Sequence, residues 1–171
     1  MEENKKTVSQ GLGDDVAKIA SAMRLDVAIN ALTFGALQNN LITVYGGKQI
    51  RPNLTMFDMI SAYKFSLKKI VKNNRPNSKI IFNLVFENLS ILNMAKRIQK
   101  TLKSKSKILI KPSNDPRSYR QNSDRIIKEG FSPKRKIEDA ILEIQKNFKS
   151  KKITQRKNFY RINTLKMISA K

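Results

Sequence analysis

The chain has 171 residues, and its 35 Lys and Arg against 13 Asp and Glu give a net charge of +22. This length suits one domain, and an apolar fraction of 40% is too high for a disordered chain. Cys and His are both absent, which excludes disulfide scaffolds, thiol nucleophiles, His-based triads and the usual zinc sites. The sequence predicts neither a membrane span nor a secretory signal, so a cytoplasmic location is expected.

The whole net positive charge lies in residues 64–171, because the six basic and six acidic side chains of residues 1–63 cancel. Two interpretations stay open. A basic half of this size attracts nucleic acid or another polyanion through counterion release, or it reflects the Lys-, Asn- and Ile-rich composition typical of an AT-rich genome. Aromatic residues are only 7% and Trp is absent, so platforms for stacking single strands are few. A small basic nucleic-acid-binding protein is therefore the alternative function.

The first part of the chain predicts a leader, a helix and a strand. Residues 1–20 carry mixed charges without clear periodicity and are expected to form a loosely attached leader. From Asp26, which is placed as an N-cap, apolar residues recur at helical spacing as far as Asn39-Asn40. Residues 41–45 (LITVY) then predict a short strand.

The middle of the chain predicts an extended segment, a second helix and a buried strand. Pro52 favours an edge or irregular strand for the extended residues 50–56. Asp58 is placed to cap the helix that follows. The apolar face expected for this helix consists of Met59, Tyr63, Leu67 and Ile70. Residues 79–86 (KIIFNLVF) are nearly all apolar, which is typical of a strand buried on both faces.

The last part of the chain predicts three helices and a short strand. Ser90 is placed to cap a helix, residues 108–110 predict the strand, and a short helix over residues 123–129 ends at Gly130. The inner face of the final helix is expected to consist of Ile137, Ile141, Ile144 and Phe148. The alternation of strands and helices predicts an α/β or α+β arrangement.

Two short stretches are candidate anion sites. In the first, YGGKQIRP, a glycine turn lies between Tyr45 and Arg51, so the backbone can approach a ligand while the guanidinium holds a phosphate. The alternative is a plain turn with a surface arginine. In the second, DPRSYR, Arg117 and Tyr119 lie close together in a loop before a helix. Its alternative is a solvated charged loop.

Motifs for catalysis and cofactor binding are missing from the sequence. Gly11-Leu-Gly13 lacks both the third glycine and the preceding strand of a dinucleotide fingerprint, and no phosphate-binding loop of the Walker type is present. None of the tyrosines has a lysine four residues later, so a Tyr-x-x-x-Lys pair is absent. We therefore assign no catalytic, cofactor-binding or metal-binding residue to this chain.

Several stretches together carry a resemblance to a known family. They are Met23–Leu32, Ile42–Pro52, Asp58–Tyr63, Phe82-Asn83, Glu87–Ser90, Asn114–Arg120 and Gly130–Ile141. In order and spacing they closely resemble the C-terminal half of the NAD-dependent epimerase/dehydratase family, the extended short-chain dehydrogenase/reductases that act on nucleotide sugars. The resemblance covers about residue 21 to the mid-140s.

The resemblance implies a fold and a division of the chain. The fold would be α/β, the C-terminal substrate-binding portion of an extended short-chain dehydrogenase, with an incomplete Rossmann sheet, packed helices and short strands. Residues 21–148 would form the nucleotide-sugar-binding half, and the basic tail, residues 149–171, would complete the family's C-terminus. Residues 79–86 would be a strand returning to the Rossmann sheet, and Asp58 a structural cap rather than a catalyst.

The resemblance also implies the residues that bind substrate. Arg51 matches the arginine that grips the nucleotide diphosphate. Tyr45 lies on the strand whose end lines the base pocket, and Asn53 falls on a neighbouring pocket position. Arg117 and Tyr119 match the loop that adds a second phosphate or sugar contact.

The sequence departs from the family pattern at single residues and in lacking a counterpart of the family's N-terminal half. Thr55 stands where the family usually has His, and Phe57 stands where it commonly has Asp. The half that binds NAD(P) and carries Tyr-x-x-x-Lys has no counterpart in the sequence, so this chain alone is expected to bind no cofactor. It would be inactive by itself, as a truncated copy, or would depend on a complementary Rossmann-half chain or a full-length relative.

Overall fold

The computed structural model describes residue 24 and residues 27–72 and 81–150. The expected leader, the cap at Asp26 and nearly all of the basic tail lie outside these residues. The helices are α2 (Ala28–Asn39), α3 (Met56–Lys72), α4 (Ile91–Thr101), α5 (Asp124–Lys128) and α6 (Ile137–Lys149). The strands are β1 (Leu41–Tyr45), β2 (Ile50–Asn53), β3 (Glu87–Ser90) and β4 (Lys107–Lys111). Within this part of the chain, none of the helices has the length and apolar character needed to cross a membrane.

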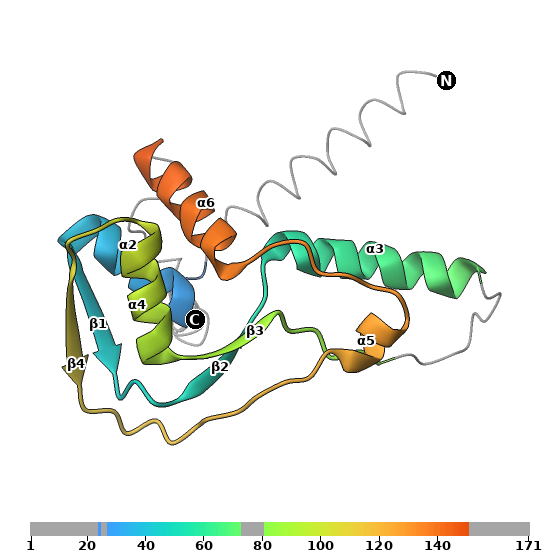
Figure 1. The fold of residues 1–171 in the computed structure, drawn as a ribbon, viewed down its shortest axis with the longest axis horizontal. Helices are drawn as coiled ribbons and strands as arrows, with labels where there is room; N and C mark the ends of the chain where they lie inside the picture. The colour runs from blue at the N-terminus through green and yellow to red at the C-terminus, as the bar shows by residue number, and fades with distance from the viewer. Residues whose placement is uncertain (1–23, 25–26, 73–80, 151–171) are drawn as a thin grey trace, which may run out of the picture.

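The strands form two short sheets. β1 and β4 pair in parallel, from Leu41 opposite Lys107 to Tyr45 opposite Lys111, whereas β2 and β3 pair antiparallel. Helices α2, α4 and α6 gather at the end of the molecule that holds β1 and β4, and α3 and α5 lie at the other end (Figure 1). The α/β class with a short parallel sheet and packed helices is therefore confirmed.

Most of the apolar core lies between the three gathered helices and β1. Its members come from α2, α4 and α6 and from alternate positions of β1, and those of α6 belong to its predicted inner face. The buried residues are Leu32, Ala36, Ile42, Val44, Met94, Ala95, Ile98, Ile137 and Ile141. Each large apolar side chain buried here contributes about 1.5–3 kcal/mol. This cluster holds the elements around the cavity described below in fixed positions.

Local signals placed several element ends correctly. The Ser90 hydroxyl accepts a hydrogen bond from the Asn93 N–H at 3.2 Å, so Ser90 caps α4 as predicted. Helix α2 ends at Asn39, and the next residue, Asn40, caps it with a left-handed φ of 49°. Gly130, with φ of 96°, follows α5. These three ends depend on side chains or conformations that the sequence itself specifies.

The predicted buried strand over residues 79–86 is wrong for the part that the structure describes. Residues 81–86 are not in a strand, and Ile81 is 74% exposed. The Ser123 hydroxyl, instead of a neighbouring strand, accepts from the Val85 N–H at 2.7 Å and donates to the Val85 carbonyl at 2.9 Å. The strand β3 begins only at residue 87, because a strand needs a hydrogen-bonded partner and β2 pairs with residues 87–90. Residues 79 and 80 lie outside the described chain.

The predicted inner face of α3 is also wrong. Met59, Tyr63 and Leu67 are exposed, and Ala62 is buried in their place against Ile126. The side chain of the fourth predicted residue, Ile70, lies outside what the structure describes.

The cap predicted for α3 is wrong as well. The helix begins at Met56, and the Thr55 hydroxyl accepts from the Asp58 N–H at 3.1 Å, so Thr55 rather than Asp58 is the capping residue. The fully buried Asp58 carboxylate instead accepts the N–H groups of Lys134 and Arg135 at 2.9 and 3.0 Å. This polar anchor turns the Asp58 side of the helix inward and the apolar stripe outward.

Candidate functional site

An open cavity of about 1060 Å³ lies between α2, the ends of β1 and β2, and the loop after β4. Its lining includes all five residues that the sequence marked: Tyr45, Arg51, Asn53, Arg117 and Tyr119. The volume is at the upper end of the range usual for small-molecule sites. Tyr45 ends β1, and the loop follows the end of β4, so the charged part of the cavity lies at the carboxyl ends of the parallel strands, while Leu41 and Thr43 extend the lining along β1. Open α/β sheets commonly bind ligands at these carboxyl ends.

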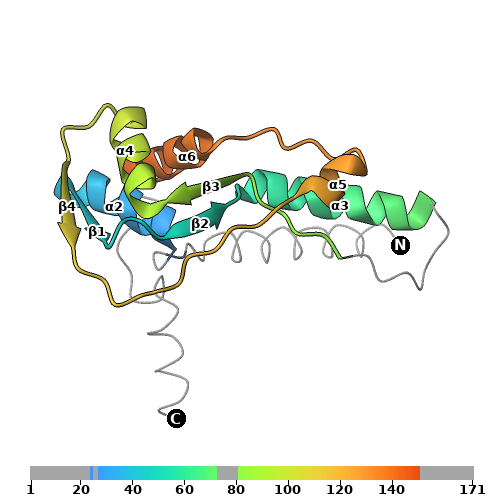
Figure 2. The same ribbon diagram turned by 60° about the horizontal axis from the view of Figure 1, so that its bottom comes forward.

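The long segment between β4 and α5 brings distant parts of the sequence together. It runs along the molecule past β2 in both ribbon views (Figures 1 and 2). The Ile50 N–H donates to the Ser118 hydroxyl at 3.0 Å, and the Tyr119 N–H donates to the Ile50 carbonyl at 3.3 Å. These bonds place Arg117 and Tyr119 beside Arg51, although 66 residues separate the two arginines.

Arg51 is a structural link as well as a cavity residue. Its side chain is only 17% exposed, which overturns the alternative of a surface arginine on a plain turn. The guanidinium donates to the carbonyls of Ile50 and Arg117, and to Asp115 Oδ2 at 3.0 Å. It also lies over the Tyr119 ring, 5.2 Å from the centroid. Arg51 therefore holds the loop against β2 and keeps a fixed positive charge at the cavity wall.

The glycine turn before β2 does not offer its backbone to a ligand, contrary to that part of the prediction. The Gly46 N–H donates to the Lys111 carbonyl, and the Gly47 N–H donates to Gln49 Oε1, both at 2.8 Å. The φ angles of 77° and 102° at Gly46 and Gly47 require glycine. The turn thus fixes the path from β1 to β2 and leaves anion binding to side chains.

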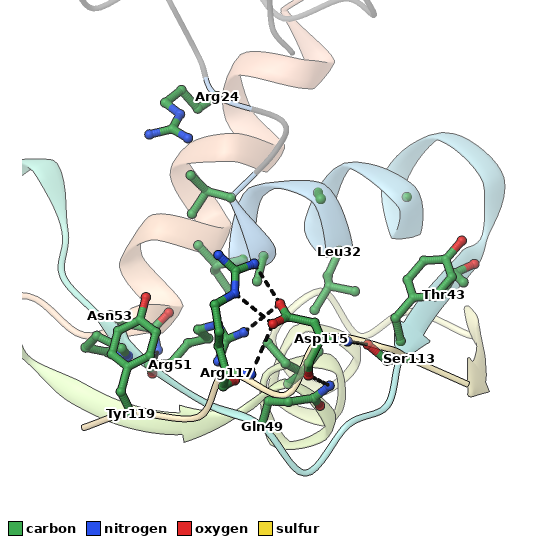
Figure 3. Close-up of a pocket in the computed structure, with 18 of the residues that line it drawn as sticks. Arg24, Leu32, Thr43, Gln49, Arg51, Asn53, Ser113, Asp115, Arg117 and Tyr119 are labelled. Carbon is green, nitrogen blue, oxygen red and sulfur yellow. Dashed lines mark hydrogen bonds and ion pairs between the residues drawn. The ribbon is translucent and has the colours of Figure 1, made fainter. Parts of the chain in front are cut away.

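Asp115 lies at the centre of the cluster and was missed as a site residue. Its Oδ1 accepts from Arg117 Nε at 2.7 Å and from the Arg117 N–H at 3.1 Å. Its Oδ2 accepts from Arg117 at 2.8 Å and from Arg51 at 3.0 Å, and Figure 3 shows both guanidiniums turned toward it. These bonds, those from Arg117 above all, hold the pKa of the Asp115 carboxyl well below its usual range. The loop therefore holds an ordered charge cluster, although most of its residues, Arg117 included, are exposed to solvent as the alternative expected.

The other marked residues take different positions around the same cavity. Asn53 Nδ2 donates to the Arg51 carbonyl at 2.8 Å and to the Glu87 carbonyl at 3.4 Å, so its amide links β2 to β3. Tyr119 and Tyr45 are each about half exposed, and their rings are accessible from the cavity side.

The charges of the lining favour an anionic ligand. Among the described lining residues, Arg24, Arg51 and Arg117 are basic and Asp115 is the one acidic residue. Arginine forks are suited to phosphate, and exposed aromatic rings are suited to the flat or apolar part of a ligand. Arg24 and Gln49 also line the cavity; both lie in stretches that carry the resemblance, but neither was marked as a binding residue.

Several solved structures resemble the chain, and two of them are dehydratases. One is dTDP-glucose 4,6-dehydratase from Bacillus anthracis in complex with NAD, at 18% identity and a TM-score of 0.59. The match covers 82% of this chain and 43% of that one. The other is TunA, an NAD-dependent NDP-hexosamine 5,6-dehydratase involved in tunicamycin biosynthesis, at 20% identity and a TM-score of 0.57. It covers 74% of this chain and 41% of TunA.

The likeness shows a shared fold. The chain shares the fold of part of each of these two proteins and spans less than half of the length of either structure. No family model and no curated protein matches the sequence.

Proposed function

We propose that residues 21–148 form the nucleotide-sugar-binding half of an NAD-dependent sugar-nucleotide dehydratase or epimerase. The observation that carries this proposal is the convergence of Arg51 and Arg117 in a cavity at the carboxyl ends of β1 and β4. Support comes from the two matched structures, which are NAD-dependent dehydratases of dTDP-glucose and of an NDP-hexosamine.

Each cavity residue has a role in this proposal. Arg51 grips the diphosphate from its fixed position on β2, and Arg117 adds a second phosphate contact from the exposed loop. Tyr45 and Asn53 line the part that receives the nucleoside, and Tyr119 contacts the sugar or a phosphate. The two aromatic rings provide apolar surface beside the charged centre.

NAD does not fit the residues that the structure describes. Gly35 lies inside α2, Gly46 and Gly47 donate their N–H groups to the protein, and Gly130 follows a helix of five residues. None of these supplies the loop at a helix N-terminus that holds a dinucleotide. We therefore propose that NAD, and the hydride chemistry it supports, belong to a Rossmann half outside the described residues.

The exposed stripe on α3 supports such a partner. Met56, Ile60, Tyr63 and Leu67 follow one another at helical spacing and are all exposed. An apolar helix face left open to water marks an interaction surface. The matched dehydratase contains more than half of its length beyond the region shared with this chain. A Rossmann half of that kind is the partner that we propose for this face, either as a complementary chain or within a full-length relative.

A thermal melt of the purified chain tests the binding proposal. A ligand present at 100 times its Kd stabilises the folded state by about 2.7 kcal/mol. One nucleotide sugar from a panel of uridine, thymidine and guanosine diphosphate sugars should raise Tm at ~0.15 M salt, an ionic strength at which weak surface attraction is largely screened. The Arg51→Ala variant should lose the shift. The Arg120→Ala variant should keep it, because Arg120 is exposed and does not line the cavity. A Tm raised only by a DNA duplex would favour the nucleic-acid alternative.

A further inference from the structure

The two arginines that we assign to the diphosphate already hold an anion, the carboxylate of Asp115. Its two oxygens accept four hydrogen bonds, three from Arg117 and one from Arg51. Side-chain N–H donors of both guanidiniums therefore point at one carboxylate, as they would point at a phosphate. Asp115 is the one acidic residue among the described lining residues, and it occupies the position where the positive charges converge.

The two arginines differ in how firmly they are held. The Arg51 side chain is 17% exposed and also donates to two main-chain carbonyls, so it stays in place whatever happens to Asp115. The Arg117 side chain is 76% exposed, and every side-chain hydrogen bond that the structure gives it goes to Asp115. Only Arg117 is therefore free to exchange its partner without disturbing β2.

We propose that Asp115 sets the charge that a ligand must carry to enter this site. The inference rests on the proposed function. In the ligand-free chain the carboxylate occupies the place of a phosphate, and a diphosphate takes Arg117 from it while Arg51 stays fixed. A weakly charged anion attracts Arg117 no more strongly than Asp115 does, and the Asp115 carboxylate also repels it. A diphosphate carries enough charge to overcome both effects. Asp115 thus competes with every ligand for Arg117 and keeps weakly charged anions out at concentrations at which a diphosphate binds.

The test compares inorganic pyrophosphate with inorganic phosphate by isothermal titration calorimetry at constant ionic strength. The wild-type chain should prefer pyrophosphate. The Asp115→Asn variant should bind both probes more tightly, inorganic phosphate by about tenfold, because a carboxylate within hydrogen-bond distance of the bound anion is neutralised. Inorganic phosphate, which the wild-type chain should bind only weakly, should therefore become a measurable ligand of the variant. The matched control is Glu143→Gln, which changes the net charge equally at an exposed position outside the cavity and should leave both affinities unchanged.

A second measurement uses the wild-type chain, so that it does not depend on the folding of a variant. In a sample with ¹⁵N-labelled arginine, pyrophosphate should shift the Nε–H resonance of Arg117 more than that of Arg51. An Arg117 signal that stays in place while pyrophosphate binds would overturn the exchange.

The remaining outcomes separate this inference from the function on which it rests. Weaker binding by a folded Asp115→Asn variant would show that Asp115 positions the arginines for the ligand, and equal gains in Glu143→Gln would show a general charge effect. Either result would overturn the proposed role of Asp115 but would leave the proposed function standing. If neither the wild type nor Asp115→Asn binds pyrophosphate or any nucleotide sugar, the proposed function itself fails.

Discussion

Replacing Asp58 by alanine should destabilise the chain through the loss of a buried anchor. The carboxylate is fully buried and accepts the main-chain N–H groups of Lys134 and Arg135, and it also accepts the hydroxyl of Thr55 at 3.0 Å. A hydrogen bond to a charged group contributes about 1.5–3 kcal/mol. Two main-chain bonds would give about 3–6 kcal/mol, but Lys134 and Arg135 are exposed, so water can reach the freed N–H groups. We therefore expect a loss of about 2–4 kcal/mol.

Urea denaturation followed by circular dichroism measures this loss. The Asp58→Asn variant keeps one acceptor oxygen and should lose about half as much. The control Glu143→Ala removes an exposed carboxylate and should stay within about 0.5 kcal/mol of the wild type. A loss below about 1 kcal/mol for Asp58→Ala would refute the view that this side chain fixes the inward face of α3.

Two further predictions concern the exposed stripe and the charge cluster. The double variant Ile60→Glu/Leu67→Glu should keep the wild-type Tm within error, because both side chains are exposed, yet bind less of the dye ANS and fail to co-purify with a co-expressed Rossmann half. A large fall in Tm would mean that these side chains are packed in the folded chain. The depressed pKa of Asp115 means that its pairs stabilise the chain above the unfolded carboxyl pKa of about 3.9, and that this contribution is lost as pH falls toward the lower folded value. The stability difference between wild type and Asp115→Asn should therefore be constant from pH 7 to pH 5 and shrink below pH 4. A difference that grows on acidification would contradict the assignment.

The elements that the sequence predicted well carry their own signals. Ile98 on α4 and Ile141 on α6 fall in regular apolar stripes, and the Ser90 hydroxyl caps α4. β1 is a β-rich run that ends at glycine. Such features depend on neighbours along the chain, so they can be derived without knowing the tertiary structure.

The elements that were predicted wrongly depend on distant partners. A residue set at helical spacing, such as Met59 and Tyr63, indicates a helix but not which side another element will cover. In α3 the buried contact of Asp58 with residues 134–135 decided that side. The apolar run at residues 81–86 indicated a strand, yet no strand lies beside it within the described chain. Neither outcome can be derived from the residues next to it in the chain.

The sequence predicted two arginines of the candidate site, Arg51 and Arg117, but not its aspartate, Asp115. Asp115 stands in the same recognisable stretch as Arg117, but an aspartate among basic residues resembles a solvated neighbour. Its role becomes visible only when the loop after β4 is seen to lie against β2. The signal that was available is the spacing of Asp115 two residues before Arg117, which allows the side chain to accept the Arg117 main-chain N–H.

The most direct measurement is a calorimetric titration of the purified chain with the nucleotide sugar that raises Tm most, at two salt concentrations and beside a DNA duplex. A binding half of a sugar-nucleotide enzyme should bind one equivalent of the nucleotide sugar at ~0.15 M salt, an affinity that Arg51→Ala removes and Arg120→Ala retains. DNA binding should fall steeply with salt over the same range. Saturable, salt-sensitive binding of DNA together with no heat from any nucleotide sugar would contradict the proposed function.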